Sequence, residues 1–187
     1  MMNRFLTTLF ILSISITASF GQSLTKTKSD FKLFNRTSIG YTFGLNETFA
    51  DKKVNALHIK TVIGFTLPQV GFGIGLETGT FNTVGAGSNS RFNTIAFTGN
   101  LHLMAKPNTD ESLNYFVKGG AGYAPRIFNS YDKGFTYEAA TGVIITTKKN
   151  NKYFIETKYH YQEFSRFNIN TGKLEVKSLG LGIGTWF

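Results

Sequence analysis

The stretch that decides the fold is Ser178-Leu179-Gly180-Leu181-Gly182-Ile183-Gly184-Thr185-Trp186-Phe187. Successive side chains of a β-strand point to opposite faces. One face of this segment would carry Leu179, Leu181, Ile183, Thr185 and Phe187, and the other would carry Ser178, Gly180, Gly182, Gly184 and Trp186. A strand of a soluble protein would fill both faces or turn the bare one to water, whereas a membrane barrel alternates lipid-facing apolar residues with small or polar lumen residues. The segment therefore favours a membrane barrel.

The same alternation recurs in seven segments upstream, at about 37–45, 54–65, 70–80, 92–104, 114–124, 135–146 and 153–162. Eight strands of about 10 residues, tilted by about 45°, give a height of roughly 24 Å, which matches the apolar band of about 25 Å in outer-membrane barrels. The pattern predicts an all-β fold, an eight-stranded antiparallel up-and-down transmembrane β-barrel over residues 36–187. An even number of strands places the first and the last residue of the barrel on the same, periplasmic side. The loops at 46–53, 82–90, 125–134 and 163–173 would then face the exterior.

The N-terminal residues have the features of an export signal. A short basic start ending in Arg4 precedes an apolar run over residues 5–17 and the small-residue site Ser19-Phe20-Gly21. This predicts a cleaved signal peptide at 1–21, followed by a periplasmic lead-in at 22–35. A membrane anchor would need about 20 apolar residues, more than this run supplies. The chain contains no cysteine, which excludes disulfides and thiolate metal sites.

The chain is basic, with a formal net charge of +9 that falls to +8 when Arg4 leaves with the signal peptide. Part of the excess lies in Lys26, Lys28, Lys32 and Arg36, and part in residues 148–152. No stripe of cations interleaved with exposed aromatic residues is present, and the export signal argues against nucleic acid as a partner. Anionic headgroups of outer-membrane lipid are the expected partner of this charge.

Charged residues within the predicted strands all fall on the inward face. Isolated charges in a narrow lumen would be costly, whereas matched charges can pair and fill it. We expect a structural ion-pair network of His58, Lys60, Glu77, His102, Lys118, Glu138, Glu156, Lys158 and His160. A proton or ion path and a catalytic site are the alternatives for the same residues. Neither a cofactor nor a catalytic residue is expected.

One pairing within this network follows from the turn at Leu67-Pro68. If that turn places Phe65 opposite Val70, the same register places His58 opposite Glu77 and Lys60 on a diagonal within reach. The three inward histidines lie on different strands, and a metal site would need them at one height. No metal is therefore expected. The glycine runs at 71–75 and 180–184 have the spacing of a strand face and do not match a nucleotide-binding loop.

The outward aromatic residues support a membrane surface. Several lie near strand ends, where the lipid headgroups of a bilayer would be: Tyr41, Phe65, Tyr115, Tyr123, Phe135, Tyr153 and Tyr161. A secreted, soluble ligand-binding barrel of the lipocalin kind would show the same alternation with the two faces exchanged. In that alternative the charges would lie on the surface. The export signal, the aromatic terminus and the evenly spread strands favour the membrane version and a bacterial outer-membrane location.

The whole segment after the signal peptide resembles the small outer-membrane barrels that include the OmpA transmembrane domain and the OmpX-type proteins. The resemblance rests on the eight alternating segments, on residues 115–123 and on the aromatic terminus. It implies that the last strand is an assembly signal for the barrel-assembly machinery, carried by Leu179, Leu181, Ile183, Trp186 and Phe187. That family covers envelope integrity, adhesion, interference with host defence and accessory roles in secretion.

We therefore expect a non-enzymatic barrel whose lumen is filled by side chains. It would act in envelope structure or in surface interactions through short external loops. The sequence does not identify a partner of these loops. A lipid-modifying outer-membrane enzyme is one alternative. The lipid A deacylases need a rim histidine with a serine two residues on, and Lys60, Met104 and Gln162 occupy the serine positions here. A narrow channel is a further alternative, although side chains just fill the interior of an eight-stranded barrel.

Overall fold

A computed structural model of the protein describes residues 32–49, 52–85, 90–107, 112–128, 133–165 and 173–187. The strands are β1 (Lys32–Gly44), β2 (Glu47–Phe49), β3 (Lys52–Thr66), β4 (Val70–Val84), β5 (Arg91–Met104), β6 (Leu113–Ala124), β7 (Gly134–Thr146), β8 (Lys152–Ser165) and β9 (Lys173–Trp186). Within this described part of the chain, no helix is both long and apolar enough to cross a membrane. The predicted signal peptide and the lead-in up to residue 31 lie outside the described residues.

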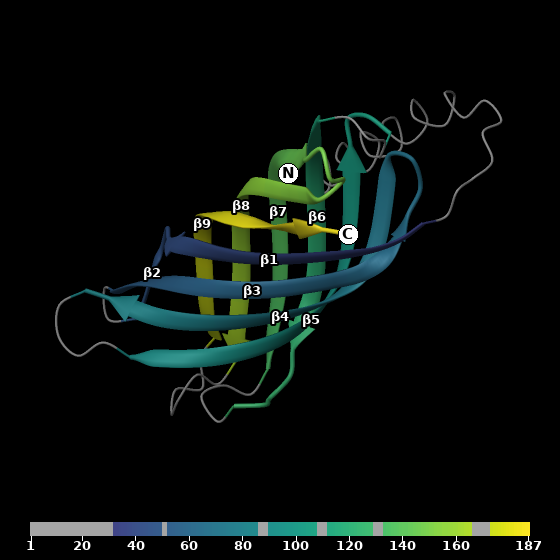
Figure 1. The fold of residues 1–187 in the computed structure, drawn as a ribbon. Helices are drawn as coiled ribbons and strands as arrows, with labels where there is room; N and C mark the ends of the chain where they lie inside the picture. Colours follow the sequence, from purple (N-terminus) through teal and green to yellow (C-terminus); the bar gives the residue numbers. More distant parts are fainter. Residues whose placement is uncertain (1–31, 50–51, 86–89, 108–111, 129–132, 166–172) are drawn as a thin grey trace, which may run out of the picture. The chain divides into compact units, whose positions relative to one another are not determined.

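The eight long strands close into one antiparallel barrel, which confirms the predicted fold class. Consecutive strands pair from β3 to β9, and β1 closes the sheet by pairing with both β3 and β9 (Figure 1). At the closure, Ile39 of β1 lies opposite Ile59 on one side and Ile183 on the other. The short strand β2 adds only a local pairing at the start of β3. Closure removes the unpaired sheet edges, which a bilayer could not solvate.

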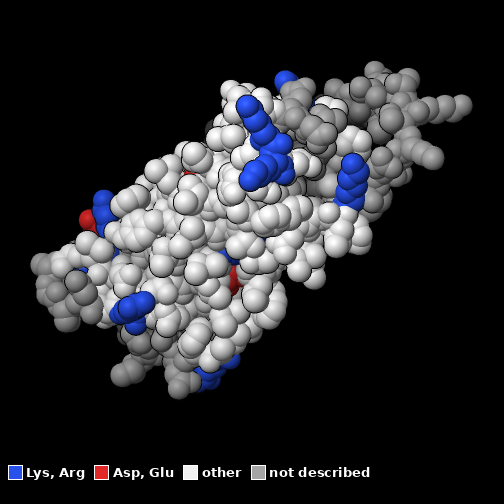
Figure 2. All heavy atoms as spheres, in the orientation of Figure 1, with Lys and Arg blue, Asp and Glu red and all other residues white. Residues whose placement is uncertain are grey.

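The two faces of the wall have opposite character, as the alternation predicted. Every second side chain is buried toward the lumen, whereas the outward row is apolar and exposed, for example Ile74 at 79% and Leu181 at 60%. Figure 2 shows Lys and Arg mainly toward the two ends of the face seen, with almost no charged atoms between. Lipid, and not water, is the solvent that fits this surface. The chain is a transmembrane barrel of the outer-membrane type, and the soluble alternative with exchanged faces is wrong.

The two ends of the barrel differ in their connections. At one end, here called the turn end, the strands are joined through residues 67–69, 105–112 and 147–151, and β1 begins and β9 ends there. At the other, the loop end, the connections span residues 45–51, 85–90, 125–133 and 166–172. Exposed aromatic side chains lie near both ends, such as Tyr115 and Tyr153 near the turn end and Tyr123 and Phe135 near the loop end. Their placement fits two headgroup levels.

The strands are longer than predicted, with 12 to 15 residues in each of the eight. β4 continues to Val84 and β9 begins at Lys173, so parts of the expected loops 82–90 and 163–173 are strand. β1 begins at Lys32, so residues 32–35 of the expected lead-in are strand. The added outward residues are mostly polar because they continue the ladder outside the apolar band, where their side chains meet water, whereas the inward row of these extensions stays buried, as at Phe34 and Phe164.

The register of the β3–β4 hairpin also differs from the prediction. Phe65 lies opposite Phe72, not opposite Val70, because the backbone N–H of Leu67 donates to the carbonyl of Val70 at 2.7 Å and closes a wider turn. The shift is two residues, so every side chain keeps its predicted face. Its consequence for the lumen is that Lys60, and not His58, stands directly opposite Glu77.

Apolar clusters fill the lumen near both ends. The loop-end cluster consists of Val54, Ala56, Phe81, Phe92, Ala96, Ala124, Phe164, Leu174 and Val176. The turn-end cluster consists of Phe34, Val62, Met104, Phe116, Ile144, Phe154 and Trp186. Glycine gives the rings space: a Cβ atom at Gly184 would lie 2.4 Å from Cζ of Phe154, closer than atoms can approach. The charged side chains lie between these two clusters.

Candidate functional site

Ten titratable side chains form a buried charged layer across the middle of the lumen. All are at most 5% exposed, and they come from every long strand except β9: Arg36, His58, Lys60, Glu77, His102, Lys118, Glu138, Glu156, Lys158 and His160. Nine of the ten are the residues that the sequence placed inward. Because the lumen is narrow, side chains from strands far apart in the sheet meet at its centre.

Most of the layer is one continuous chain of ion pairs. Lys60 Nζ lies 2.7 Å from Glu138 Oε1 and 3.5 Å from Glu77 Oε2. Lys118 Nζ lies 3.0 Å from Glu138 Oε1 and 3.2 Å from Glu156 Oε1. Each of these ammonium groups bridges two carboxylates, so both charges of every pair are compensated. Such compensation is what makes burial of the charges tolerable.

Arg36 ends this chain and is the residue that the sequence analysis missed. Its guanidinium pairs with Glu156 and donates to Nε2 of His102 at 3.1 Å. It also stacks on the ring of Phe154, 3.9 Å from the centroid. From the sequence, Arg36 is named only as part of the basic excess near the N-terminus and not as an inward residue. A signal was available, because Phe34, Arg36 and Ser38 continue the inward row of β1 by steps of two.

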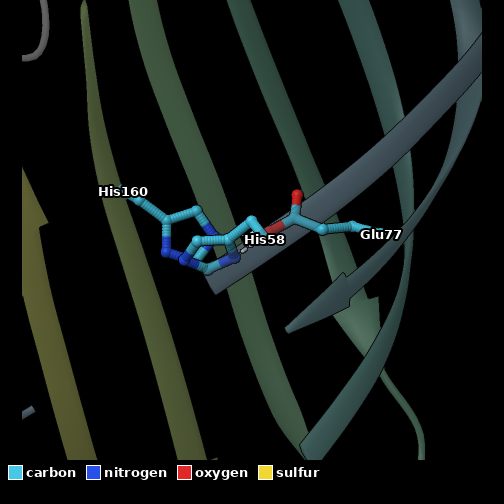
Figure 3. A group of neighbouring side chains, drawn as sticks. All are labelled: His58, Glu77 and His160. Carbon is cyan, nitrogen blue, oxygen red and sulfur yellow. Dashed lines mark ion pairs between the residues drawn. The ribbon is translucent and has the colours of Figure 1, made fainter. Parts of the chain in front are cut away.

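A histidine–carboxylate cluster lies at the other end of the ion-pair chain. Glu77 Oε1 is 2.9 Å from Nδ1 of His58 and 3.0 Å from Nε2 of His160 (Figure 3). The two imidazole rings lie 4.4 Å apart between centroids. The structure thus brings together two of the three inward histidines, and it leaves His102 with Arg36 and the turn-end cluster.

Two threonine hydroxyls hold the imidazoles of this cluster. Thr42 Oγ1 lies 3.1 Å from Nε2 of His58, and Thr136 Oγ1 lies 3.2 Å from Nε2 of His160. Thr42, His58 and Glu77 consequently have the hydroxyl–imidazole–carboxylate connectivity of a hydrolase triad. Thr42, however, is fully buried, and its hydroxyl donates to the carbonyl of Ala56 at 3.4 Å. A substrate has no access to this hydroxyl in the closed barrel.

Lys158 differs from the other cations of the layer. Among the described residues, no carboxylate lies within ion-pair distance of its ammonium group. Gly40 makes room for it, since a Cβ there would lie 3.1 Å from Lys158 Nζ. The layer holds four permanent cations and three carboxylates, so it carries one surplus positive charge when the histidines are neutral.

Four of the predicted assembly residues lie on β9, and Phe187 directly follows its last residue. Leu179, Leu181, Ile183 and Phe187 are exposed on the outer face, whereas Trp186 is buried in the turn-end cluster and stacks on Phe34 at 5.0 Å between ring centroids. Recognition of this strand by the assembly machinery stays a prediction.

No known family model matches the sequence, and no curated protein matches it. The barrel is similar to several solved structures. The outer membrane protein OprG from Pseudomonas aeruginosa is 8% identical, with a TM-score of 0.48 over 83% of this chain and 95% of OprG. The outer membrane enzyme PagL is 12% identical, with a TM-score of 0.46 over 79% and 97% of the two chains. The N-terminal β-barrel domain of Pseudomonas aeruginosa OprF is 15% identical, with a TM-score of 0.43 over 83% and 97%. These likenesses concern the fold alone.

Proposed function

We propose that this protein is a plugged, non-enzymatic outer-membrane barrel that acts in envelope structure or in contacts at the cell surface. Transport through the lumen is not part of this role. The observation that carries the proposal is the filling of the lumen: a charged layer lies between an apolar cluster at each end. Three aromatic rings, Phe81, Phe92 and Phe164, contact one another across the loop end at 5.1 to 5.4 Å between centroids.

The charges of the layer are neutralised by one another. In a water-filled pore lined with charges, the ammonium and carboxylate groups would form hydrogen bonds to water. Here Lys60 and Lys118 are each shared by two carboxylates, and Arg36 is enclosed by Glu156 and aromatic rings. Moving an ion through the layer would require these pairs to separate in a medium of low polarity, which is costly.

The buried triad-like arrangement supports the non-enzymatic part of the proposal. A nucleophile must reach its substrate, and catalytic residues lie in clefts open to it. The only hydroxyls that contact an imidazole within the described residues belong to Thr42 and Thr136, which are at most 2% exposed. The hydrogen bonds of these hydroxyls to carbonyl oxygens of Ala56 and Tyr161 suit a structural role.

The outer surfaces would then carry the function. We propose that the loop end faces the exterior, where strands such as β4 and β8 continue beyond the apolar band. Exposed cations lie at both barrel ends, for example Lys173 at the loop end and Lys32 and Lys149 at the turn end. Their charge suits the anionic headgroups of outer-membrane lipid.

Planar-bilayer conductance tests the proposal. The purified full chain is refolded and inserted, and its compact gel mobility without boiling verifies the closed barrel. We expect no discrete conductance steps beyond those of a protein-free bilayer, and no swelling of liposomes in small sugars. A porin reconstituted in the same lipid controls for the sensitivity of both assays. Reproducible single-channel steps from the folded protein would refute the plugged barrel.

A further inference from the structure

We propose that His58, Glu77 and His160 form a binding site for a transition-metal ion, with Zn²⁺ as the reference ion. The three side chains project into the lumen from β3, β4 and β8, so the closed barrel brings them together (Figure 3). One donor atom from each lies within 4.8 Å of the others, and all three residues are buried. A set of two histidines and one carboxylate with a further open position is a known zinc ligand set.

The donor chemistry selects the class of ion. Two neutral imidazole nitrogens and one carboxylate oxygen suit Zn²⁺, Cu²⁺, Ni²⁺ or Co²⁺. Ca²⁺ and Mg²⁺ require several oxygen ligands, and the site offers one carboxylate, whose second oxygen faces Lys60 at 3.5 Å. The site therefore discriminates against hard cations such as Ca²⁺ and Mg²⁺.

The contacts around His58 suit a metal ligand. The Thr42 hydroxyl lies 3.4 Å from the carbonyl of Ala56 and 3.1 Å from Nε2 of His58. When the hydroxyl donates to Ala56 and accepts from Nε2–H, Nδ1 of His58 carries no proton and directs its lone pair toward Oε1 of Glu77, 2.9 Å away. In that tautomer a cation between the two lone pairs, a proton or a metal ion, would be stabilised. Nδ1 of His58 makes no hydrogen bond of acceptable geometry, although it is buried.

The ring of His160 is held in a different way. Its Nε2 faces both Glu77 Oε1 at 3.0 Å and Thr136 Oγ1 at 3.2 Å, while the Thr136 hydroxyl donates to the carbonyl of Tyr161 at 3.0 Å. Thr136 therefore contacts the nitrogen that would bind the ion, whereas Thr42 contacts the nitrogen of His58 that lies away from Glu77 and is the outer-shell group of the site. The two rings thus already point their nitrogens toward one carboxylate oxygen, and a bound ion would take the place of the shared protons.

The surplus positive charge of the layer sets a limit on affinity. Lys158 lies two residues from His160 in the same inward row and has no carboxylate at ion-pair distance among the described residues. It opposes a second cation nearby. Lys60 opposes it less, because its ammonium lies closer to Glu138, at 2.7 Å, than to Glu77. We therefore expect weaker binding than in structural zinc sites, and tighter binding in Lys158→Met.

Access to the site depends on folding. The ring of Phe81 from the loop-end cluster covers His58, at 5.5 Å between ring centroids. An ion would therefore be captured as the barrel closes. This predicts that metal present during refolding is retained, whereas metal added to the folded barrel enters slowly.

The test refolds the purified full chain with Zn²⁺ or with a chelator, removes free metal and measures bound zinc and the unfolding temperature. We expect one zinc per chain and a higher unfolding temperature with zinc. His58→Ala and His160→Ala should lose the zinc. His102→Ala is the matched control, because it removes a buried lumen histidine outside the cluster and should retain the zinc. Thr42→Val should weaken binding by about 10- to 100-fold, as outer-shell changes do.

Folding of each variant is verified by its compact gel mobility, so that a loss of metal is not confused with misfolding. Co²⁺ gives a second readout, since an ion bound by imidazole and carboxylate has a visible absorption that free Co²⁺ in detergent lacks. Zinc-free wild-type protein after refolding with Zn²⁺ would overturn the site, and the cluster would then hold only protons. Equal loss in His102→Ala and His160→Ala would overturn it as well.

Discussion

Substitution of Arg36 tests how much the charged layer contributes to stability, because Arg36 is the last residue of the ion-pair chain. Arg36→Met keeps most of the side-chain volume and removes the guanidinium. Glu156 would then keep only Lys118 Nζ, at 3.2 Å. Removing one partner of a buried ion pair typically costs about 3–5 kcal/mol. Loss of the stacking on Phe154 adds about 1–2 kcal/mol, and the remaining Lys118 contact offsets part of the total. We expect the free energy of unfolding to fall by about 3–5 kcal/mol.

A double-mutant cycle separates this effect from lost packing. Arg36→Met combined with Glu156→Gln removes one charge of each sign, and Lys118 keeps Glu138 at 3.0 Å. The double variant should be more stable than Arg36→Met alone, with a coupling energy in the range of about 0.5–3 kcal/mol that is typical of contacting residues. Strictly additive losses would contradict the argument.

Urea unfolding of the refolded protein in lipid vesicles, followed by gel mobility without boiling, measures these free energies. Lys32→Met is the matched control, since Lys32 continues the same row of β1 as Arg36 but is exposed at the turn end. This variant should unfold like the wild type. If Arg36→Met lowers the free energy of unfolding by less than about 1 kcal/mol, the layer adds little to stability. Substitutions of ordinary surface residues already change this free energy by about 0.5 kcal/mol.

Two further predictions concern the lumen and the wall. Gly184→Val should prevent the compact gel mobility, because a Cβ there would lie 2.2 Å from the carbonyl oxygen of Thr37, whereas Gly119→Ala, with nothing within 4 Å of its Cβ, should fold normally. Trp186, the only tryptophan, should resist quenching by brominated lipids, because its side chain is 2% exposed and faces the lumen. Strong quenching by brominated lipids would mean that β9 presents its other face to the bilayer.

The faces of the strands could be predicted from the sequence, but the strand ends could not. The alternation in the last strand has period two, and only one assignment of its faces gives an apolar outer surface around a closed barrel. Residues 82–84 look like a loop because they are polar or adjoin glycine, yet Asn82 pairs with Asn55 and Val84 with Lys53. Outside the lipid band the outward row of a strand meets water and can be polar, although Thr83 on the inward row stays buried. The apolar outward row that defines a transmembrane strand therefore disappears there.

The contacts within the lumen were predictable only in part. Charge alternation placed Lys60 and Glu77 on one face, and their contact holds although the predicted register was wrong by two residues. The contact of Glu77 with His160 joins β4 to β8 across the barrel. It depends on how far the strands are staggered around the closed sheet and on the rotamers of both side chains, and neither quantity is written in a local pattern.

The charged layer also favours one of the two faces of each strand for contact with lipid. A one-residue slip would turn the whole inward row of a strand outward. In β8 the slip would move Glu156, Lys158 and His160 into the bilayer, where a lysine near the midplane costs about 2–4 kcal/mol. In β9 the inward row carries no charge, so a slip is resisted mainly by the fit of Leu174 and Val176 into the loop-end cluster and of Trp186 into the turn-end cluster. An apolar plug of equal volume would fill the lumen as well, but both faces of each strand would then be equally soluble in lipid. We therefore expect the buried charges to favour one register over the alternatives that an apolar interior would allow.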